Sequence, residues 1–476
     1  MMRCKGFVRG IAGGLVLLSM VTAAAAAVKL PALIGDNMVL QSGQSVPIWG
    51  WADKGEQITV GFAGQCVTTK ADDTGRWKVS LAKLEAGGPH EMTIRGSSGN
   101  LTLKNILVGE VWVCSGQSNM EMGIGIAKDA KQEIAAAKYP QIRLFTVTKV
   151  RAPQPAADVK GAWAECSPTT VSNGTWGGFS AAAYFFGRTV HQELKVPVGL
   201  IHTSWGGTPA QSWTSRKALE AEPVLKQVHG SDLYNGMIAP LIPYAIRGVI
   251  WYQGEANVGG AYQYRTLFPT MIRNWRTDWA QGDFPFLFVQ IAPYMYNRPG
   301  KDGKPVEESR RQACAELWEA QLLTLKNVPH TGMVVTTDIG DVRNIHPQNK
   351  QEVGRRLALW ALAKVYGRDL VCSGPIYQSM TIEGNKIRLA FESATGLKSA
   401  DGKPLSDFTI AGADQKFLPA EAQIDGSTIL VSSPAVAQPA AVRFGWREDA
   451  QPNLVNAAGL PASPFRTDAW KGVTQK

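Results

Sequence analysis

The stretch VWVCSGQSNMEM at residues 111–122 joins an apolar run to a cluster of small polar residues. The run Val-Trp-Val-Cys is typical of a strand that is buried on both faces. It ends at Ser-Gly-Gln-Ser-Asn, where a glycine two positions before Ser118 favours a tight turn. Such a turn presents the Ser118 hydroxyl and its backbone N–H at the start of a helix. Ser118 is therefore either a helix cap or a nucleophile at a strand end.

The same pattern continues along the chain, where apolar runs alternate with helix-like segments. Apolar strands separated by helices are typical of a parallel sheet covered on both faces. The sequence thus predicts an α/β fold, a doubly wound parallel sheet in three layers, with ligands at the carboxyl ends of the strands. The expected strands are residues 106–114, 141–147, 196–204, 246–254, 285–292 and 331–338, and the expected helices are 179–194, 261–279 and 347–367.

In the last of these helices, Val353, Leu357, Trp360 and Lys364 mark one face, and the aliphatic stem of Lys364 ends the stripe. Short β-like runs separated by turn signals flank the α/β region on both sides. The predicted organisation is a small β-sandwich-like domain at 28–104, a catalytic domain at 105–371 and a second small β domain at 372–476.

Residues 1–27 have a basic start, a short apolar core and a run of alanines, which is the pattern of a signal peptide cleaved near Ala27. No later segment is apolar for long enough to span a bilayer. We therefore expect an exported protein, periplasmic or extracellular, without a membrane anchor. Without Arg3, Lys5 and Arg9 the net charge falls from +10 to +7, and no Lys/Arg block points to nucleic acid.

Five cysteines remain in the mature chain. They are sparse and odd in number, so they do not form a disulfide framework, and at most one or two bridges are expected. No C-x-x-C zinc spacing appears among them. They are Cys66, Cys114, Cys166, Cys314 and Cys372.

Polar residues follow several of the expected strands. Gly206 and Gly207 come after the third strand, where paired glycines either make a turn or present backbone N–H groups to a ligand. Gln253 ends the fourth strand, where its amide either joins a polar loop network or donates to a developing oxyanion. A nucleophilic serine also needs a base, normally histidine. Of the six histidines, only His346 lies in a loop past a strand's carboxyl end and just before a helix.

Four blocks of this chain together resemble those of the sialate O-acetylesterase family, a branch of the SGNH (GDSL-type) hydrolases. The resemblance covers about residues 105–370. The blocks are Gly-Gln-Ser-Asn-Met at 116–120, Trp-Gly-Gly-Thr-Pro at 205–209, Gln-Gly-Glu at 253–255, and Asp-Ile-Gly-Asp with Asn-Ile-His-Pro within 338–347.

This resemblance implies a role for each residue singled out above. Ser118 attacks the ester carbonyl, and His346 takes its proton and returns it to the sugar hydroxyl. The oxyanion is held by the amide of Ser118, an amide of Gly206 or Gly207, and the side chain of Gln253. Ser115 is the serine left inside the turn.

The third member of the triad departs from the family pattern. Many SGNH hydrolases carry an Asp three residues before the histidine, and here that position is Arg343, which cannot accept a proton from imidazole. Asp341 is the predicted orienting acid. The alternatives are Asp338, or a backbone carbonyl and a simple Ser-His pair.

The predicted function is a secreted serine esterase that removes acetyl groups from a carbohydrate through an acyl-enzyme, with no metal or organic cofactor. The substrate is an acetylated sugar or oligosaccharide, either a sialic acid or a plant cell-wall sugar of xylan or xyloglucan. The alternatives are a non-catalytic carbohydrate-binding protein and a lipolytic esterase, although the polar stretch at 253–257 argues against an apolar cleft. The oligomeric state stays open.

Overall fold

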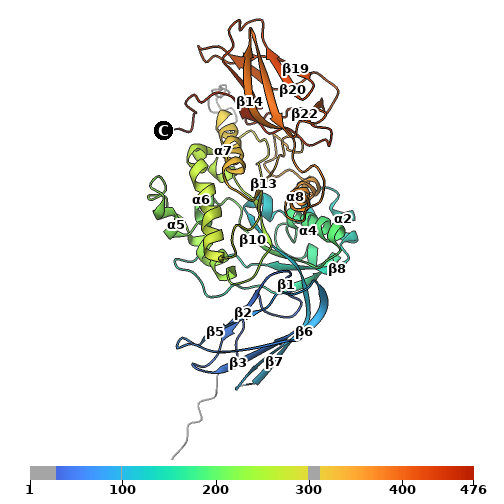
Figure 1. Ribbon diagram of the computed structural model, residues 1–476, viewed down its shortest axis with the longest axis vertical. Coiled ribbons are helices and arrows are strands. Elements are labelled where there is room, and N and C mark those ends of the chain that lie inside the picture. The colour runs from blue at the N-terminus through green and yellow to red at the C-terminus, as the bar shows by residue number, and fades with distance from the viewer. Residues whose placement is uncertain (1–27, 98, 298–310, 476) are drawn as a thin grey trace, which may run out of the picture.

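The computed structural model describes residues 28–97, 99–297 and 311–475. The predicted signal peptide, residues 1–27, lies outside this part of the chain. Figure 1 shows the N-terminal strands at one end, the α/β body in the middle and the C-terminal strands at the other end. No helix in the described part is long and apolar enough to cross a membrane.

The predicted parallel sheet is confirmed. Strand β7 (Gly99–Gly116) lies at its centre, and its second half is buried on both faces. On one side follow β10 (Val198–Ser204) and β8 (Tyr139–Thr146), both parallel, and then the antiparallel β9 (Trp163–Cys166). On the other side follow β11 (Gly248–Tyr252), β12 (Phe286–Val289) and β13 (Thr331–Val334), all parallel.

Helices cover both faces of this sheet (Figure 1). On one face α4 (Ala181–Leu194) packs against α8 (Lys350–Lys364), and Gly354 permits their close approach, since a Cβ there would lie 2.5 Å from the Cβ of Phe185. On the other face α6 (Ala261–Trp279) packs against α7 (Ala313–Asn327), a helix that the sequence analysis did not predict. Shorter helices are α1 (Ser118–Glu121), α2 (Ala130–Ala136), α3 (Pro168–Ser172) and α5 (Arg216–Ala221).

The N-terminal strands share β7 with the α/β body. Its first half pairs antiparallel with β6 (Gly87–Gly96), so the boundary predicted between 104 and 105 falls inside one continuous strand. The short strand β1 (Val39–Gln41) also runs parallel to β7. The remaining bounds are β2 (Val46–Trp51), β3 (Gln57–Phe62), β4 (Gln65–Lys70) and β5 (Arg76–Leu81).

The C-terminal region is built of small antiparallel sheets, as predicted. Its attachment to the body includes Arg466, whose Nε donates to Glu319 of α7 over 2.8 Å. All five described cysteines are free. The main strands are β14 (Ile376–Glu383), β15 (Lys386–Glu392), β20 (Thr428–Ser432), β19 (Glu421–Asp425), β17 (Phe408–Ala411) and β21 (Ala441–Phe444); the short ones are β16 (Lys398–Ser399), β18 (Leu418–Pro419), β22 (Leu454–Val455) and β23 (Phe465–Arg466).

Candidate active site

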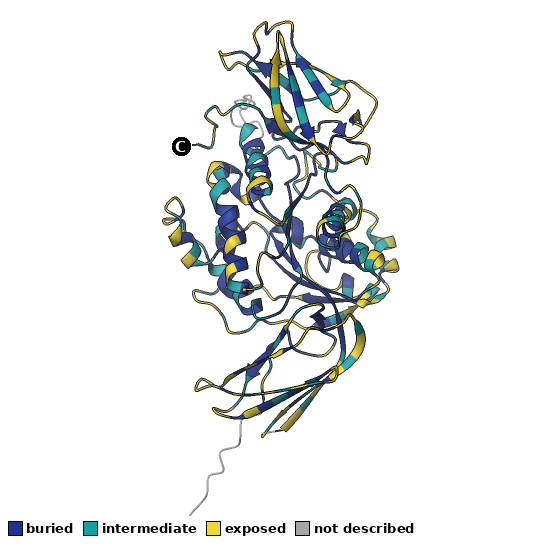
Figure 2. Ribbon diagram, viewed as in Figure 1, coloured by how far each residue is buried: buried dark blue, intermediate teal, exposed yellow. Residues whose placement is uncertain are grey.

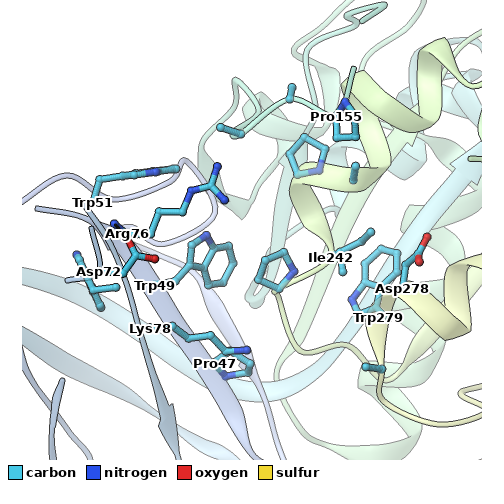
Figure 3. A pocket seen from close by; sticks show the side chains of 18 of the residues that line it. Pro47, Trp49, Trp51, Asp72, Arg76, Lys78, Pro155, Ile242, Asp278 and Trp279 are labelled. Carbon is cyan, nitrogen blue, oxygen red and sulfur yellow. Dashed lines mark hydrogen bonds between the residues drawn. The ribbon is translucent and has the colours of Figure 1, made fainter. Parts of the chain in front are cut away.

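A cavity of about 910 Å³ forms a cleft between the N-terminal strands and the α/β body. Figure 3 shows Trp49, Trp51 and Arg76 on one wall and Ile242 and Trp279 on the other. None of the predicted site residues lines this cleft. The volume of a cavity alone therefore does not identify the active site.

A smaller cavity of about 640 Å³ lies at the carboxyl end of β7, where ligands bind in doubly wound sheets. Its wall contains Ser118, Gly206, Gly207 and His346. Four of the six predicted site residues are thus brought together from three separate loops. This cavity is the candidate active site.

Ser118 is placed by the turn that ends β7. Gly116 has φ +140°, and a Cβ there would lie 2.2 Å from the carbonyl oxygen of Tyr252, so only glycine fits. Gln117 follows as the N-cap and Ser118 opens α1, and the backbone N–H of Ser118 donates to no acceptor among the residues that the structure describes. Ser115 is fully buried on β7, and its hydroxyl has no partner there.

His346 lies in the loop between β13 and α8, half-buried at the cavity wall. Its backbone N–H donates to Oδ1 of Asn344 over 3.0 Å, and its ring meets the ring of Trp176 edge to face, with centroids 4.9 Å apart. Burial, together with the positive charge of Lys350, lowers the pKa of His346, while Glu121 acts in the opposite direction. The lowered pKa favours the neutral imidazole, which is the form that can accept a proton.

The expected contact between Asp341 and His346 does not form. Oδ1 of Asp341 instead accepts the backbone N–H of Arg343 over 2.9 Å, because an aspartate two residues ahead closes such a turn locally. Asp338 is held by a bidentate pair with Arg356, at 2.7 and 2.6 Å. Within the described ranges neither acid hydrogen-bonds to the imidazole.

Gly206 lies directly against the serine, since a Cβ on it would be 3.2 Å from the Cβ of Ser118. Its backbone N–H donates to Oε2 of Glu121 over 2.7 Å, and the same carboxylate pairs with Lys149. Gly207 is exposed, with φ +72°. The sequence analysis missed Glu121, although it stands three residues after Ser118 on the helix face that a turn at Ser118 exposes.

Gln253 is fully buried and does not line the cavity. Its Nε2 donates to the carbonyl of Thr208 over 3.2 Å and to Oδ1 of Asn257 over 2.7 Å, while the Tyr264 hydroxyl donates to its Oε1. Both amide hydrogens are thus engaged with protein acceptors. An oxyanion role requires that one of them be exchanged for the substrate oxygen, and this role stays a prediction.

Replacing Gln253 with alanine tests that role. Loss of an oxyanion donor should lower kcat by about 10²–10³-fold with little change in KM, because the bond strengthens mainly in the transition state. Gln253→Glu, which has the same size but no amide donor, is the matched variant and should show the same loss. If both variants keep normal kcat and only their melting temperature falls, Gln253 supports the loop and does not touch the oxyanion.

A second serine-histidine contact lies within β10, where Nε2 of His202 is 2.6 Å from the Ser204 hydroxyl. Both side chains are buried, and burial lowers the pKa of His202 to about 4. These residues line a different cavity, of about 530 Å³. Ser204 sits inside the strand ladder, which leaves it without the free helix-start amide that Ser118 has.

A serine and a histidine in one cavity at the carboxyl end of a doubly wound sheet are the arrangement of a carboxylic ester hydrolase, and comparison with known proteins agrees. The family of carbohydrate esterases described as sialic acid-specific acetylesterases matches residues 108–363. The chain belongs to this family.

Similar proteins extend the match over nearly the whole chain. Human sialate O-acetylesterase is 30% identical, over 92% of this chain and 92% of its own, and the rat enzyme is 30% identical, over 92% and 94%. The crystal structure of a carbohydrate acetylesterase from Xanthomonas citri superimposes with a TM-score of 0.85 and 41% identity, covering 93% of this chain and all of that one. The protein is thus a carbohydrate O-acetylesterase.

Proposed function

We propose that the enzyme is exported and hydrolyses acetyl esters of a sugar through Ser118 and His346. The observation that carries the proposal is that these two residues, far apart in sequence, line one cavity at the carboxyl end of β7. Export rests on the signal-peptide pattern of residues 1–27. An exported enzyme should begin near Val28, as N-terminal sequencing of the periplasmic or extracellular protein would reveal.

The reaction divides into two transfers of the acetyl group. Oγ of Ser118 attacks the acetyl carbonyl while His346 takes the proton of that hydroxyl. The bond between the acetyl carbon and the sugar oxygen then breaks, and His346 gives the proton to the departing sugar oxygen. The acetyl group remains on Ser118 until water attacks its carbonyl while His346 takes a proton from that water. The bond between the acetyl carbon and Oγ of Ser118 then breaks, acetate leaves, and His346 returns the proton to Oγ. The free N–H of Ser118 is one donor to the oxyanion, and the Gly206 amide is a second once the substrate oxygen displaces Glu121.

The substrate is proposed to be an O-acetylated sialic acid. Support comes from the human and rat relatives and from the positive net charge of the mature chain. The alternative is an acetylated plant cell-wall sugar, since the similar Xanthomonas citri protein is named only as a carbohydrate acetylesterase.

A panel of substrates decides between these sugars. O-acetyl sialic acid should give the highest kcat/KM, compared with acetylated xylan and xyloglucan oligosaccharides at equal acetyl concentration. Ser118→Ala serves as the blank. A clear preference for the neutral oligosaccharides would replace the sialic acid assignment, and no acetate from any member would favour a binding protein.

A further inference from the structure

Three polar side chains are packed together beside the active-site cavity, and one of them, Glu255, also lines it. They are Asn119 of α1, Glu255, which opens the short helix Glu255–Gly260, and Lys350, which opens α8. Asn119 and Lys350 are fully buried, and Glu255 is 9% exposed. Nδ2 of Asn119 donates to Oε1 of Glu255 over 2.6 Å, and Nζ of Lys350 donates to Oδ1 of Asn119 over 2.7 Å. Burying an amine and a carboxyl group in this way is costly.

The same cluster forms hydrogen bonds to the histidine loop on both sides of His346. Nδ2 of Asn119 also donates to the carbonyl of Ile345 over 2.9 Å, and Nζ of Lys350 donates to the carbonyl of Pro347 over 2.8 Å. Asn119 directly follows the nucleophile Ser118. These bonds therefore connect the serine turn to the two residues that flank the base.

The cluster also acts on the histidine through charge. Burial lowers the pKa of Lys350 to about 7, against the opposing effect of Glu255, so the amine is protonated below that pH. The groups facing Lys350 are Glu255, the amide of Asn119 and the ring of Tyr252, whose centroid is 5.2 Å from Nζ. The charge of Lys350 is one of the causes that lower the pKa of His346, and Glu121 opposes it.

We infer that Lys350 is a positioning residue of the esterase reaction, which holds His346 in place through Asn119 and the carbonyl of Pro347. The inference rests on the proposed Ser118–His346 mechanism. It also explains how the imidazole is placed although neither Asp341 nor Asp338 contacts it. In this arrangement the buried amine of Lys350 fixes the position of the histidine loop. In a Ser-His-Asp triad the aspartate fixes the histidine instead.

The test uses variants that separate the hydrogen bonds of Lys350 from its charge. Lys350→Met removes both, and Lys350→Gln keeps a donor, on a side chain one atom shorter, without the charge. Asn119→Ala removes the bonds to Ile345 and Lys350 but keeps the charge. Lys364→Met is the matched control, since Lys364 is exposed at the other end of the same helix. The profile of kcat/KM against pH is recorded for each, with circular dichroism to check folding.

Lys350→Met should lower kcat by about 10–100-fold with KM nearly unchanged, because misplacement of the base costs rate and not substrate binding. It should also move the acid limb of kcat/KM to higher pH by about half a unit or more, since the lost charge no longer opposes protonation of His346. Lys350→Gln should show the same move of the limb with a smaller loss of kcat. Asn119→Ala should lose kcat without moving the limb, and Lys364→Met should do neither.

The inference is overturned if Lys350→Met or Lys350→Gln folds and leaves the acid limb unmoved, or if only KM rises. Should Lys350→Met fail to fold, the glutamine and Asn119 variants carry the comparison alone. Failure of the proposed function is recognised separately, because an active Ser118→Ala variant would refute the mechanism whatever the Lys350 variants do.

Discussion

Ser118→Ala should lower acetate release by about 10⁴–10⁶-fold, the loss seen when a catalytic serine is removed. The hydroxyl stands at the carboxyl end of β7 in the wall of the cavity, beside a backbone N–H that is free to hold an oxyanion. Because alanine keeps the turn, KM and the melting temperature should change little. The measurement is the initial rate of acetate release under saturating substrate.

Ser115→Ala is the matched control for this variant. The Ser115 hydroxyl is buried in β7 without a partner, so its removal breaks no hydrogen bond and should leave kcat unchanged. A serine-reactive phosphonate should label Ser118 and not Ser115, as located by peptide mass spectrometry. Normal turnover by Ser118→Ala, or labelling at Ser115, contradicts the assignment of the nucleophile.

His346→Ala should cost a similar factor, about 10⁴–10⁶ in kcat, because serine and base act as a unit and removing either disables both. The acid limb of the kcat/KM profile should disappear as well. In the wild type that limb should lie below the ordinary pKa of histidine, because burial and Lys350 lower the pKa of His346. Activity should therefore persist into mildly acidic solution and fall when the imidazole becomes protonated.

Asp341→Asn is the informative companion to the histidine variant. Its carboxylate is exposed and accepts a backbone N–H, and an asparagine oxygen accepts the same bond. We expect kcat within several-fold of the wild type, where loss of a true orienting acid costs up to about 10⁴-fold. A loss on that scale would restore Asp341 as the third member of the triad.

Strands of the central sheet were predictable because they are apolar at nearly every position, and the structure buries them on both faces. The helix Ala313–Asn327 was not, since most of its positions are buried and the buried ones include Glu316, Gln321 and Thr324, so its sequence shows no clear apolar stripe. The boundary near residue 104 was drawn where short β-like runs give way to continuous apolar runs that alternate with helix-like segments. In the structure the burial of β7 changes from alternating to continuous within the strand, because its first half is covered on one face and its second half on both.

The site was predictable to the extent that it consists of strand ends. Ser118, Gly206, Gly207 and His346 all follow buried strands and all reach one cavity. Contacts that depend on loop conformation, those of Asp341 and Gln253, did not follow from position along the chain. The helix stripe of Val353, Leu357 and Trp360 was extended in the wrong direction, to the exposed Lys364; its buried polar member is Lys350, one turn before Val353, where the serine turn docks.

The uninterrupted course of β7 also limits how this enzyme can be rearranged by recombination or engineering. The first half of β7 pairs with the N-terminal strand β6. Its last residue, Gly116, makes the turn that places Ser118. A module swap at the apparent junction would cut the strand that sets the serine's register, and a slip of one residue would turn every side chain to the opposite face. The N-terminal layer therefore cannot be exchanged separately from the hydrolase, as a module joined by a flexible linker could be.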